Sequence, residues 1–331
     1  MHMMATIILL ALAFVFIFQM MSRMPSMPSI SRPSVGGTNS SPVAPPGASY
    51  FDSICREADV TAVDTWTAIS GWAGATPGSV KVPSQAKYLC GIDVVTAWDL
   101  GGAVGVGAIS AFRLSGNGLA KGGMYRFLAH GATQTIVTDA GAGMDVDVMH
   151  YPLAIPVVGG NDIDCEGILL GSDPGEATFV MAFQFSDKPA PGGFVDGDFR
   201  EGDVAAVDTE TQLTAIGTAS PGNPTVPIDK SFLAAVTPLI AIDAGTGAVT
   251  VRQAGAARIG GNGLKLGGSY RFVLPGGWMS AVTTGGGAFS NSPVIQSVGL
   301  PLVPGNTLEL YTIVLGEDPG DTYTAIGLLY Q

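Results

Sequence analysis

The sequence predicts an all-β chain with two tandem jelly-roll or β-sandwich domains produced by an internal duplication, preceded by one N-terminal transmembrane helix. Three observations predict this fold class. Long segments recur at an offset of 144 or 145 residues, apolar and polar residues alternate with the period of a strand, and residues 3–21 are almost wholly apolar. A repeat of this length is the size of a whole domain, which is too long for one unit of a solenoid.

Residues 1–22 are predicted to form a membrane helix. Within this segment a run of 19 residues has only Thr6 and Gln19 as polar side chains, and about 20 apolar residues cross ~30 Å of hydrocarbon. A secretory signal fits less well, because nothing basic precedes the run and no Ala-x-Ala site follows it. Arg23 and Arg32 come after the helix, so the positive-inside rule places the bulk of the chain on the cytoplasmic side.

Residues 23–55 are predicted to be a linker rich in Pro, Ser and Gly. A regular helix is excluded here by Pro25, Pro28 and the prolines from Pro42 to Pro46. Such a composition is typical of an extended spacer.

Residues 56–186 and 200–331 are predicted to be the two domains, joined by residues 187–199. Three pairs of similar segments define the repeat. They are Arg56–Thr65 with Arg200–Thr209, Gly116–Phe127 with Gly261–Phe272, and Leu170–Gly175 with Leu315–Gly320.

Strands and turns are predicted throughout both domains. The odd-numbered residues from Phe179 to Phe185 are apolar and large, which is the period-2 pattern of a strand with one buried face. Turn segments such as Gly116-Asn117-Gly118 fall every ten to fifteen residues. Eight strands in about 130 residues are typical of a two-sheet sandwich. In the first domain they are predicted near 60–70, 80–83, 87–99, 104–115, 123–130, 145–157, 162–171 and 177–186, and the second domain repeats them about 145 residues further on.

The composition excludes some classes of partner. Charged residues make up only 13% of the chain, and the net charge is −12. Binding to a nucleic-acid backbone needs clustered Lys and Arg, so we predict no nucleic-acid partner. A charge-poor surface favours burial against neighbouring subunits.

No catalytic, cofactor-binding or metal-binding residue is assigned from the sequence. The three histidines, His2, His130 and His150, lie near no nucleophile or metal motif, and we predict structural or surface roles for them. The three cysteines show no ligand spacing and do not recur with the repeat, which favours small buried side chains over disulfides. These are Cys55, Cys90 and Cys165. The tryptophans are predicted to pack in cores or interfaces, with a sugar platform as the alternative; they are Trp66, Trp72, Trp98 and Trp278.

Acidic residues gather in a few places without the loop spacing of a calcium site. We predict a solvated acidic face, with calcium binding as the alternative. The groups are Asp145 with Asp147, Asp162 with Asp164 and Glu166, and Asp196 with Asp198, Glu201 and Asp203. Three acids recur in both repeats and are predicted to hold turns and caps; the pairs are Asp59/Asp203, Asp64/Asp208 and Asp173/Asp318. A pair of glycosidase carboxylates would have to be assembled from loops that the sequence does not place.

Residues 55–331 together resemble the double jelly-roll major capsid proteins of tailless, membrane-containing icosahedral viruses. The resemblance rests on the duplication, on the eight strands of each copy and on a closing pattern that both copies share. That pattern runs from Ile155 to Phe185 in the first copy and from Leu300 to Tyr330 in the second.

The resemblance implies a structural virion protein that trimerises into pseudo-hexagonal capsomers, which tile an icosahedral shell over an internal membrane. It implies that the chain is not an enzyme and that it needs no cofactor. The implied partners are other copies of the chain, the membrane that the N-terminal helix reaches, and a penton or minor capsid protein. The implied location is the membrane-associated capsid of a virion. Two alternatives stay open, a membrane-anchored surface adhesin, pilus or surface-layer subunit, and a carbohydrate-active enzyme or lectin.

Overall fold

A computed structural model of the chain shows strands and the turns between them. The residues it describes are 50–99, 106–134, 148–171, 176–204, 206–243, 250–280, 288–291, 293–316 and 321–331. Eighteen strands and no helix occur in these ranges. The described residues all belong to one compact unit.

For the residues that the structure describes, the predicted fold class is corrected to all-β, with no membrane helix among them. Among the residues that the structure describes, no helix is long and apolar enough to cross a membrane. Residues 1–22, to which the helix was assigned, lie outside the described residues, as does the linker up to residue 49. The predicted β-sandwich architecture itself is confirmed by the sheets described next.

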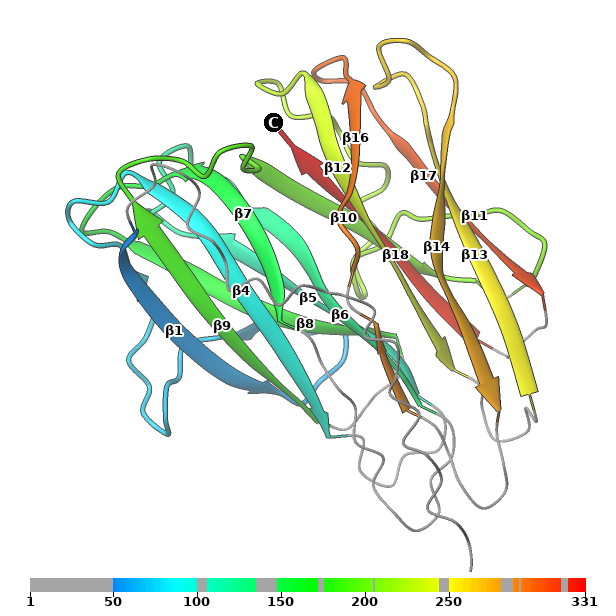
Figure 1. The fold of residues 1–331 in the computed structure, drawn as a ribbon, viewed down its shortest axis with the longest axis horizontal. Coiled ribbons are helices and arrows are strands. Elements are labelled where there is room, and N and C mark those ends of the chain that lie inside the picture. Colours follow the sequence, from blue (N-terminus) through cyan, green and yellow to red (C-terminus); the bar gives the residue numbers. More distant parts are fainter. Residues whose placement is uncertain are drawn as a thin grey trace, which may run out of the picture. The chain divides into compact units, whose positions relative to one another are not determined.

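Two sheets, which we name A and B, form the first sandwich (Figure 1). Sheet A has the order β1-β9-β4-β7, and sheet B has the order β15-β6-β5-β8-β2, with β3 pairing onto β8. The strands of sheet A are β1 (Tyr50–Val60), β9 (Glu176–Ser186), β4 (Tyr88–Asp99) and β7 (Met149–Pro156). Those of sheet B are β15 (Ala288–Asn291), β6 (Tyr125–Gln134), β5 (Val106–Ser115), β8 (Asp162–Gly171), β2 (Thr67–Ala68) and β3 (Val80–Lys81).

Sheets C and D form the second sandwich. Sheet C has the order β10-β18-β12-β16, and sheet D has the order β11-β17-β13-β14. The strands of sheet C are β10 (Asp196–Asp203), β18 (Asp321–Tyr330), β12 (Phe232–Asp243) and β16 (Gln296–Pro301). Those of sheet D are β11 (Thr211–Gln212), β17 (Glu309–Gly316), β13 (Thr250–Gly260) and β14 (Tyr270–Ser280).

Corresponding strands occupy corresponding places in the two sandwiches. Sheet C repeats the order of sheet A, with β10, β18, β12 and β16 in the places of β1, β9, β4 and β7. Sheet D repeats the order of the β6-β5-β8-β2 part of sheet B. The duplication in the sequence is therefore a duplication of one two-sheet fold.

One short strand of the second repeat joins the first sandwich. β15 pairs antiparallel with β6 at the edge of sheet B, from Ala288 opposite Gln134 to Asn291 opposite Gly131. Its backbone hydrogen bonds tie the second repeat to the first. The repeat in the sequence does not predict this pairing, because nothing in a four-residue segment specifies which sheet edge it joins.

Each sandwich has an apolar core between its two sheets. In the first, the rings of Phe112 and Phe127 have centroids 5.2 Å apart, and Tyr151 lies 6.0 and 5.2 Å from them. Aromatic pairs at such distances add stability beyond the area they bury. The face predicted from the alternation in β9 is confirmed as core, since its members are all fully buried: Phe179, Met181, Phe183 and Phe185.

The first strand lies earlier than predicted. A strand was predicted near residues 60–70, whereas β1 covers Tyr50–Val60 and only the two-residue β2 follows in that region. The apolar alternation of β1 is interrupted by Arg56, because this residue stands between Ile54 and Ala58 on the side of the strand that packs against the core. Its guanidinium is satisfied by carbonyl oxygens, at 2.8 Å from that of Cys55 and 2.9 Å from that of Gly78.

The repeated Gly-Asn-Gly segments are tight turns held against a neighbouring strand. Gly116 has a φ of +102°, and a Cβ there would lie 2.7 Å from the backbone oxygen of Asp162, so only glycine fits. Asn117 Oδ1 accepts a hydrogen bond of 3.0 Å from the N–H of Asp162. The second sandwich uses the same construction, with a φ of +96° and a 3.0 Å hydrogen bond, through Gly261, Asn262 and Thr307.

Candidate functional site: the seam between the sandwiches

The two sandwiches pack against each other through an apolar surface that we call the seam. It joins the outer face of sheet B to the outer face of sheet C, and Trp66 and Tyr323 lie at its margin. Its buried members are Ile109, Ala111, Leu128, Ile168, Leu170, Phe199, Ile216, Leu239, Ala241 and Ala325. Because these side chains leave water only when the sandwiches meet, the seam stabilises one arrangement of the two domains.

The backbones approach closely at one end of the seam. A Cβ on Gly197 of β10 would lie 2.6 Å from a ring carbon of Phe127 and 2.8 Å from the backbone oxygen of Arg126. No side chain fits at this distance. Glycine at position 197 is therefore required by the contact between sheets B and C.

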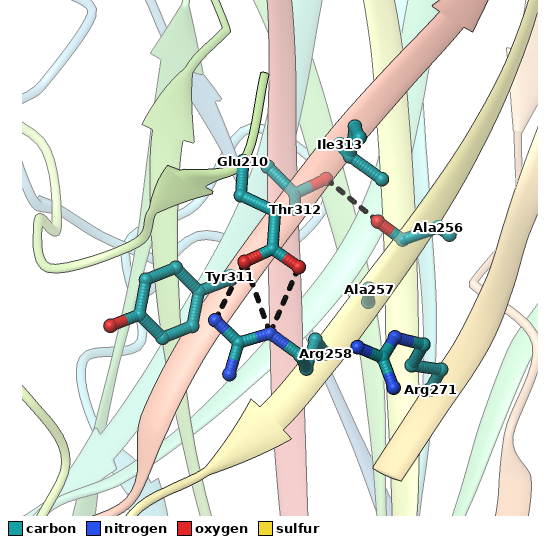
Figure 2. Close-up of a pocket in the computed structure, with 8 residues that line it drawn as sticks. All are labelled: Glu210, Ala256, Ala257, Arg258, Arg271, Tyr311, Thr312 and Ile313. Atoms are coloured by element: carbon teal, nitrogen blue, oxygen red, sulfur yellow. Dashed lines mark hydrogen bonds and ion pairs between the residues drawn. The ribbon is translucent and has the colours of Figure 1, made fainter. Parts of the chain in front are cut away.

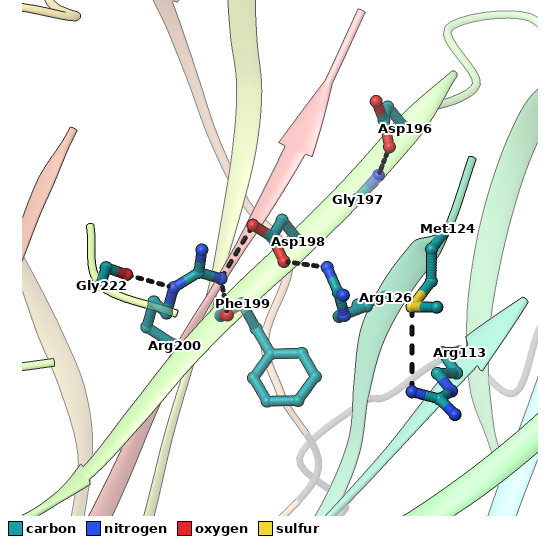
Figure 3. Close-up of polar contacts among 9 residues, drawn as sticks. All are labelled: Arg113, Met124, Arg126, Asp196, Gly197, Asp198, Phe199, Arg200 and Gly222. Atoms are coloured by element: carbon teal, nitrogen blue, oxygen red, sulfur yellow. Dashed lines mark hydrogen bonds and ion pairs between the residues drawn. The ribbon is translucent and has the colours of Figure 1, made fainter. Parts of the chain in front are cut away.

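Two arginines from different sandwiches share one carboxylate at this end of the seam (Figure 3). Asp198 on β10 accepts from Arg126 of β6 at 3.2 Å and from Arg200 of its own strand at 2.8 Å. Arg200 also donates to the carbonyl oxygens of Phe199, at 2.6 Å, and Gly222, at 2.7 Å. Arg200 is buried, and Asp198 and Arg126 are partly buried, so breaking this charged network is expected to be destabilising.

An exposed ion pair lies beside this network. Lys121 of the first sandwich contacts Asp229 of the second at 2.5 Å, and Lys230 contacts the same oxygen at 2.8 Å. The hydrogen bonds from these two lysines lower the pKa of Asp229 to about 2. The half-exposed pair between Lys121 and Asp229 contributes little to stability, so we assign it a role in orienting the sandwiches.

Two carboxyl groups from different sandwiches lie together at the other part of the seam. Glu201 on β10 is 8% exposed, and its Oε1 accepts a hydrogen bond of 3.0 Å from the N–H of Gly217. Gly217 packs against Asp64 of the first sandwich, since a Cβ there would lie 3.2 Å from Asp64 Cα. Asp64 itself has a φ of +57°, which few residues other than glycine adopt.

The surroundings of these acids favour their protonated forms. Burial, the charge of Asp64 and the charge of Asp203 raise the pKa of Glu201 to about 7, against the opposing hydrogen bond from Gly217. Burial also raises the pKa of Asp64. Further along β10, burial raises the pKa of Asp196 to about 6. The seam therefore holds groups that exchange protons near neutral pH.

A small cavity of about 20 Å³ marks the outer face of sheet D (Figure 2). Arg258 lies 3.9 Å from the ring centroid of Tyr311 and binds both carboxylate oxygens of Glu210, at 3.0 and 2.7 Å. The cavity has room for about one water molecule. We interpret this cluster as a structural tie between β13, β17 and the segment before β11.

The first sandwich contains the same tie with two positions exchanged. Arg113, which corresponds to Arg258, lies 4.4 Å from the ring centroid of Trp66 and pairs with Glu166 at 2.6 Å. The aromatic side chain thus stands at the place of Glu210, and the acid stands at the place of Tyr311. A position-by-position comparison of the repeats does not reveal this similarity. Both sandwiches have an arginine, an acid and an aromatic residue, but the acid and the aromatic residue stand at exchanged positions.

Several residues singled out in the sequence have structural surroundings. Asp164 accepts from Ser79 at 2.7 Å, Glu166 pairs with Arg113, and Asp59 accepts from Thr178 at 2.6 Å. Asp64 and Asp208 stand in turns with the same φ of +57°. Some residues singled out in the sequence are not among those that the structure describes. These are His2, Asp145, Asp147, Asp173 and Asp318, together with the side chain of Trp278.

The remaining candidate ligands are dispersed. His150 contacts Asp93 at 2.6 Å on sheet A, whereas His130 is buried. Cys90 and Cys165 are buried and Cys55 is partly buried, each as a free thiol. Among the described residues, no group of three or more His, Cys, Asp or Glu side chains could hold a metal ion.

No protein-family model matches the sequence, and no curated protein is similar to it in sequence. Solved structures share parts of its architecture. A PNGF-II structure is 10% identical with a TM-score of 0.38, over 76% of this chain and 59% of that chain. A peptide:N-glycanase F structure is 11% identical with a TM-score of 0.33, over 84% and 96%. The major capsid protein P2 from bacteriophage PM2 is 9% identical with a TM-score of 0.26, over 85% and 98%.

These likenesses extend to the β-sandwich architecture and no further. The chain spans less than two thirds of the length of the PNGF-II chains, at 59% and 64% in two structures. The prediction that the chain is not an enzyme is corrected, because a glycosylasparaginase from Flavobacterium meningosepticum is among the proteins of similar architecture. Of the predicted resemblance to capsid proteins, the β-sandwich architecture is confirmed by the order of the sheets.

Proposed function

We propose that the chain is a structural virion protein, a capsid subunit whose two jelly rolls trimerise into capsomers that tile a shell. The observation that carries the proposal is the seam, which fixes two sandwiches of the same strand order into one block. The order β1-β9-β4-β7 facing β6-β5-β8-β2 is that of a jelly roll with eight strands. A rigid block with two similar halves suits repeated contacts in a lattice better than a flexible pair of domains does.

The seam is also a contact between two different faces, which is what assembly into a ring needs. It joins different faces of the two sandwiches, since sheet B belongs to one half of the fold and sheet C corresponds to sheet A. Heterologous contacts of this kind form closed rings when the rotation between neighbours divides a full turn. Three chains would then place six similar sandwiches around one axis. A charged fraction of only 13% suits the large buried area of such rings.

The solution mass of the full-length chain tests this proposal. We expect mass photometry in a mild detergent to give about three times the 33.7 kDa of one chain, persisting on dilution because obligate interfaces are large and apolar. A protein that is monomeric at every concentration would overturn the proposal.

A hydrolase that acts on glycosidic bonds is a second candidate, favoured by the carboxyl groups of Glu201 and Asp64. Glycosidases use a pair of carboxyl groups, one of them protonated; Glu201 has a pKa of about 7, and the second acid is Asp64, whose pKa burial also raises. We expect this candidate, if correct, to release chromophore from a panel of chromogenic glycosides near neutral pH, with at least a 100-fold loss in Glu201→Gln. Equal rates in both proteins would reject it.

A further inference from the structure

The internal seam leaves two corresponding faces outside it. Within the chain, the seam uses the outer face of sheet B from the first sandwich and the outer face of sheet C from the second. The corresponding surfaces are the outer face of sheet D and the outer face of sheet A. The chain thus carries a second pair of surfaces that correspond, by the repeat, to the two that bind each other.

Sheet D exposes large apolar side chains where sheet B buries its own. Leu128 is 0% exposed in the seam, whereas Val273 at the same place in sheet D is 73% exposed. Leu170 is 1% exposed, whereas Leu315 is 40% exposed. Exposed apolar residues that gather on one face mark an interaction site.

The first sandwich shows the complementary exposure. Ile216 is 6% exposed in the seam, and its counterpart in the first repeat is Trp72, which is 45% exposed. The outer face of sheet A also carries Val95 and Val180, which stand at the places of Leu239 and Ala325 of the seam and are only partly buried. Tryptophan is the residue type most enriched among side chains that dominate binding energy.

The outer face of sheet A is acidic along β1, whereas that of sheet D carries two arginines, of which Arg258 is already paired with Glu210. The outer positions of β1 in sheet A include Glu57 and Asp59. In sheet D, Arg258 and Arg271 are cross-strand neighbours. Arg271 corresponds to Arg126, which binds Asp198 across the seam, whereas Ile54 stands at the place of Asp198 on β1, so the acids that face Arg271 would be others of β1. Opposite potentials steer such faces together and fix their orientation.

From these observations we infer that a second copy of the chain docks the outer face of its sheet D on the outer face of sheet A, in the manner of the seam. The inference rests on the proposed function and specifies its interface. The contact is heterologous, so each copy offers one donor face, with Val273 and Leu315, and one acceptor face, with Trp72. It is similar to the seam without being identical, because Ser53 and Ala73 stand at the places of Gly197 and Gly217, so the two sheets cannot approach as closely as sheets B and C do.

Two variants of the full-length chain test the docking. Val273→Asp disables the donor face and Trp72→Asp disables the acceptor face; both side chains are exposed, so the fold should be retained, which circular dichroism checks. We expect each variant alone to be monomeric by mass photometry. An equimolar mixture should give dimers and nothing larger, because only one good pair of faces remains. Val158→Asp is the matched control, since Val158 is 40% exposed, like Leu315, and lies on neither face; it should assemble as the wild type does.

The outcomes separate this inference from the proposed function. If the wild type assembles and both face variants still assemble fully, the docking is overturned while the structural role stands. A mixture that stays monomeric would also overturn the heterologous pairing. A wild type that is monomeric at every concentration would overturn both.

Discussion

Replacing Glu201 with glutamine is expected to stabilise the folded chain at pH 8 by up to about 3 kcal/mol, with little effect at pH 4.5. Burial, reinforced by the charges of Asp64 and Asp203, raises the pKa of Glu201 from 4.5 to about 7. Between these values the folded state keeps a proton that the unfolded state has released, so stability falls as the pH rises from 4.5 through 7. The amide cannot ionise and still accepts the hydrogen bond from Gly217, so the variant avoids that loss.

Thermal unfolding of the full-length wild type and Glu201→Gln at pH 4.5, 6 and 8 measures this effect. We expect the melting temperature of the wild type to fall more steeply with pH than that of the variant. Glu57→Gln is the control for removing one glutamate, because Glu57 holds the corresponding place in the first sandwich and is only partly buried. Parallel pH profiles for wild type and Glu201→Gln would contradict the account of the buried carboxyl group.

Replacing Arg200 with alanine is expected to lower the free energy of unfolding by about 3 kcal/mol, at the low end of the range for breaking a buried ion pair, because Asp198 is partly exposed and keeps Arg126. Its side chain is 6% exposed and contacts Asp198 at 2.8 Å. The substitution leaves the carboxylate of Asp198 with one of its two described cation partners, Arg126. It also removes the hydrogen bonds to the carbonyl oxygens of Phe199 and Gly222.

Arg56 provides the matched comparison, because it holds the same place in the first repeat. It donates to the carbonyl oxygens of Cys55 and Gly78 and is only partly buried. Arg56→Ala should therefore cost about 1–2 kcal/mol, the value of lost hydrogen bonds. Denaturant unfolding of both variants measures the two losses in the free energy of unfolding. Equal losses would show that the contact between Arg200 and Asp198 at the seam contributes no additional stability.

The sequence predicts much of the fold inside each sandwich, since local physical chemistry specifies it. The Gly-Asn-Gly turns follow from a φ that only glycine adopts freely, and the alternation from Phe179 to Phe185 follows from one buried face. The start of β1 escaped prediction because Arg56 interrupts its apolar alternation. The sequence does not predict which sheet edge β15 joins, because tertiary contacts determine the partner of a short strand.

The candidate site depends on how the domains dock, and sequence reasoning missed it for that reason. The acids from Asp196 to Asp203 were assigned in part to a linker, whereas they lie on β10. Asp196 and Asp198, and likewise Glu201 and Asp203, are two residues apart, which is a usable signal for a strand. Nothing local, however, indicates that Asp64 lies beside Glu201, since 137 residues separate them in the sequence. Only the fit of sheet B on sheet C brings the two carboxyl groups together.

Electron cryo-microscopy of the full-length assembly tests the central claim most directly. The account predicts closed particles in which six sandwiches surround one axis, with sheet D of each chain against sheet A of the next. Single two-sandwich particles, or assemblies in which the faces bearing Trp72 and Val273 stay exposed to solvent, would contradict it.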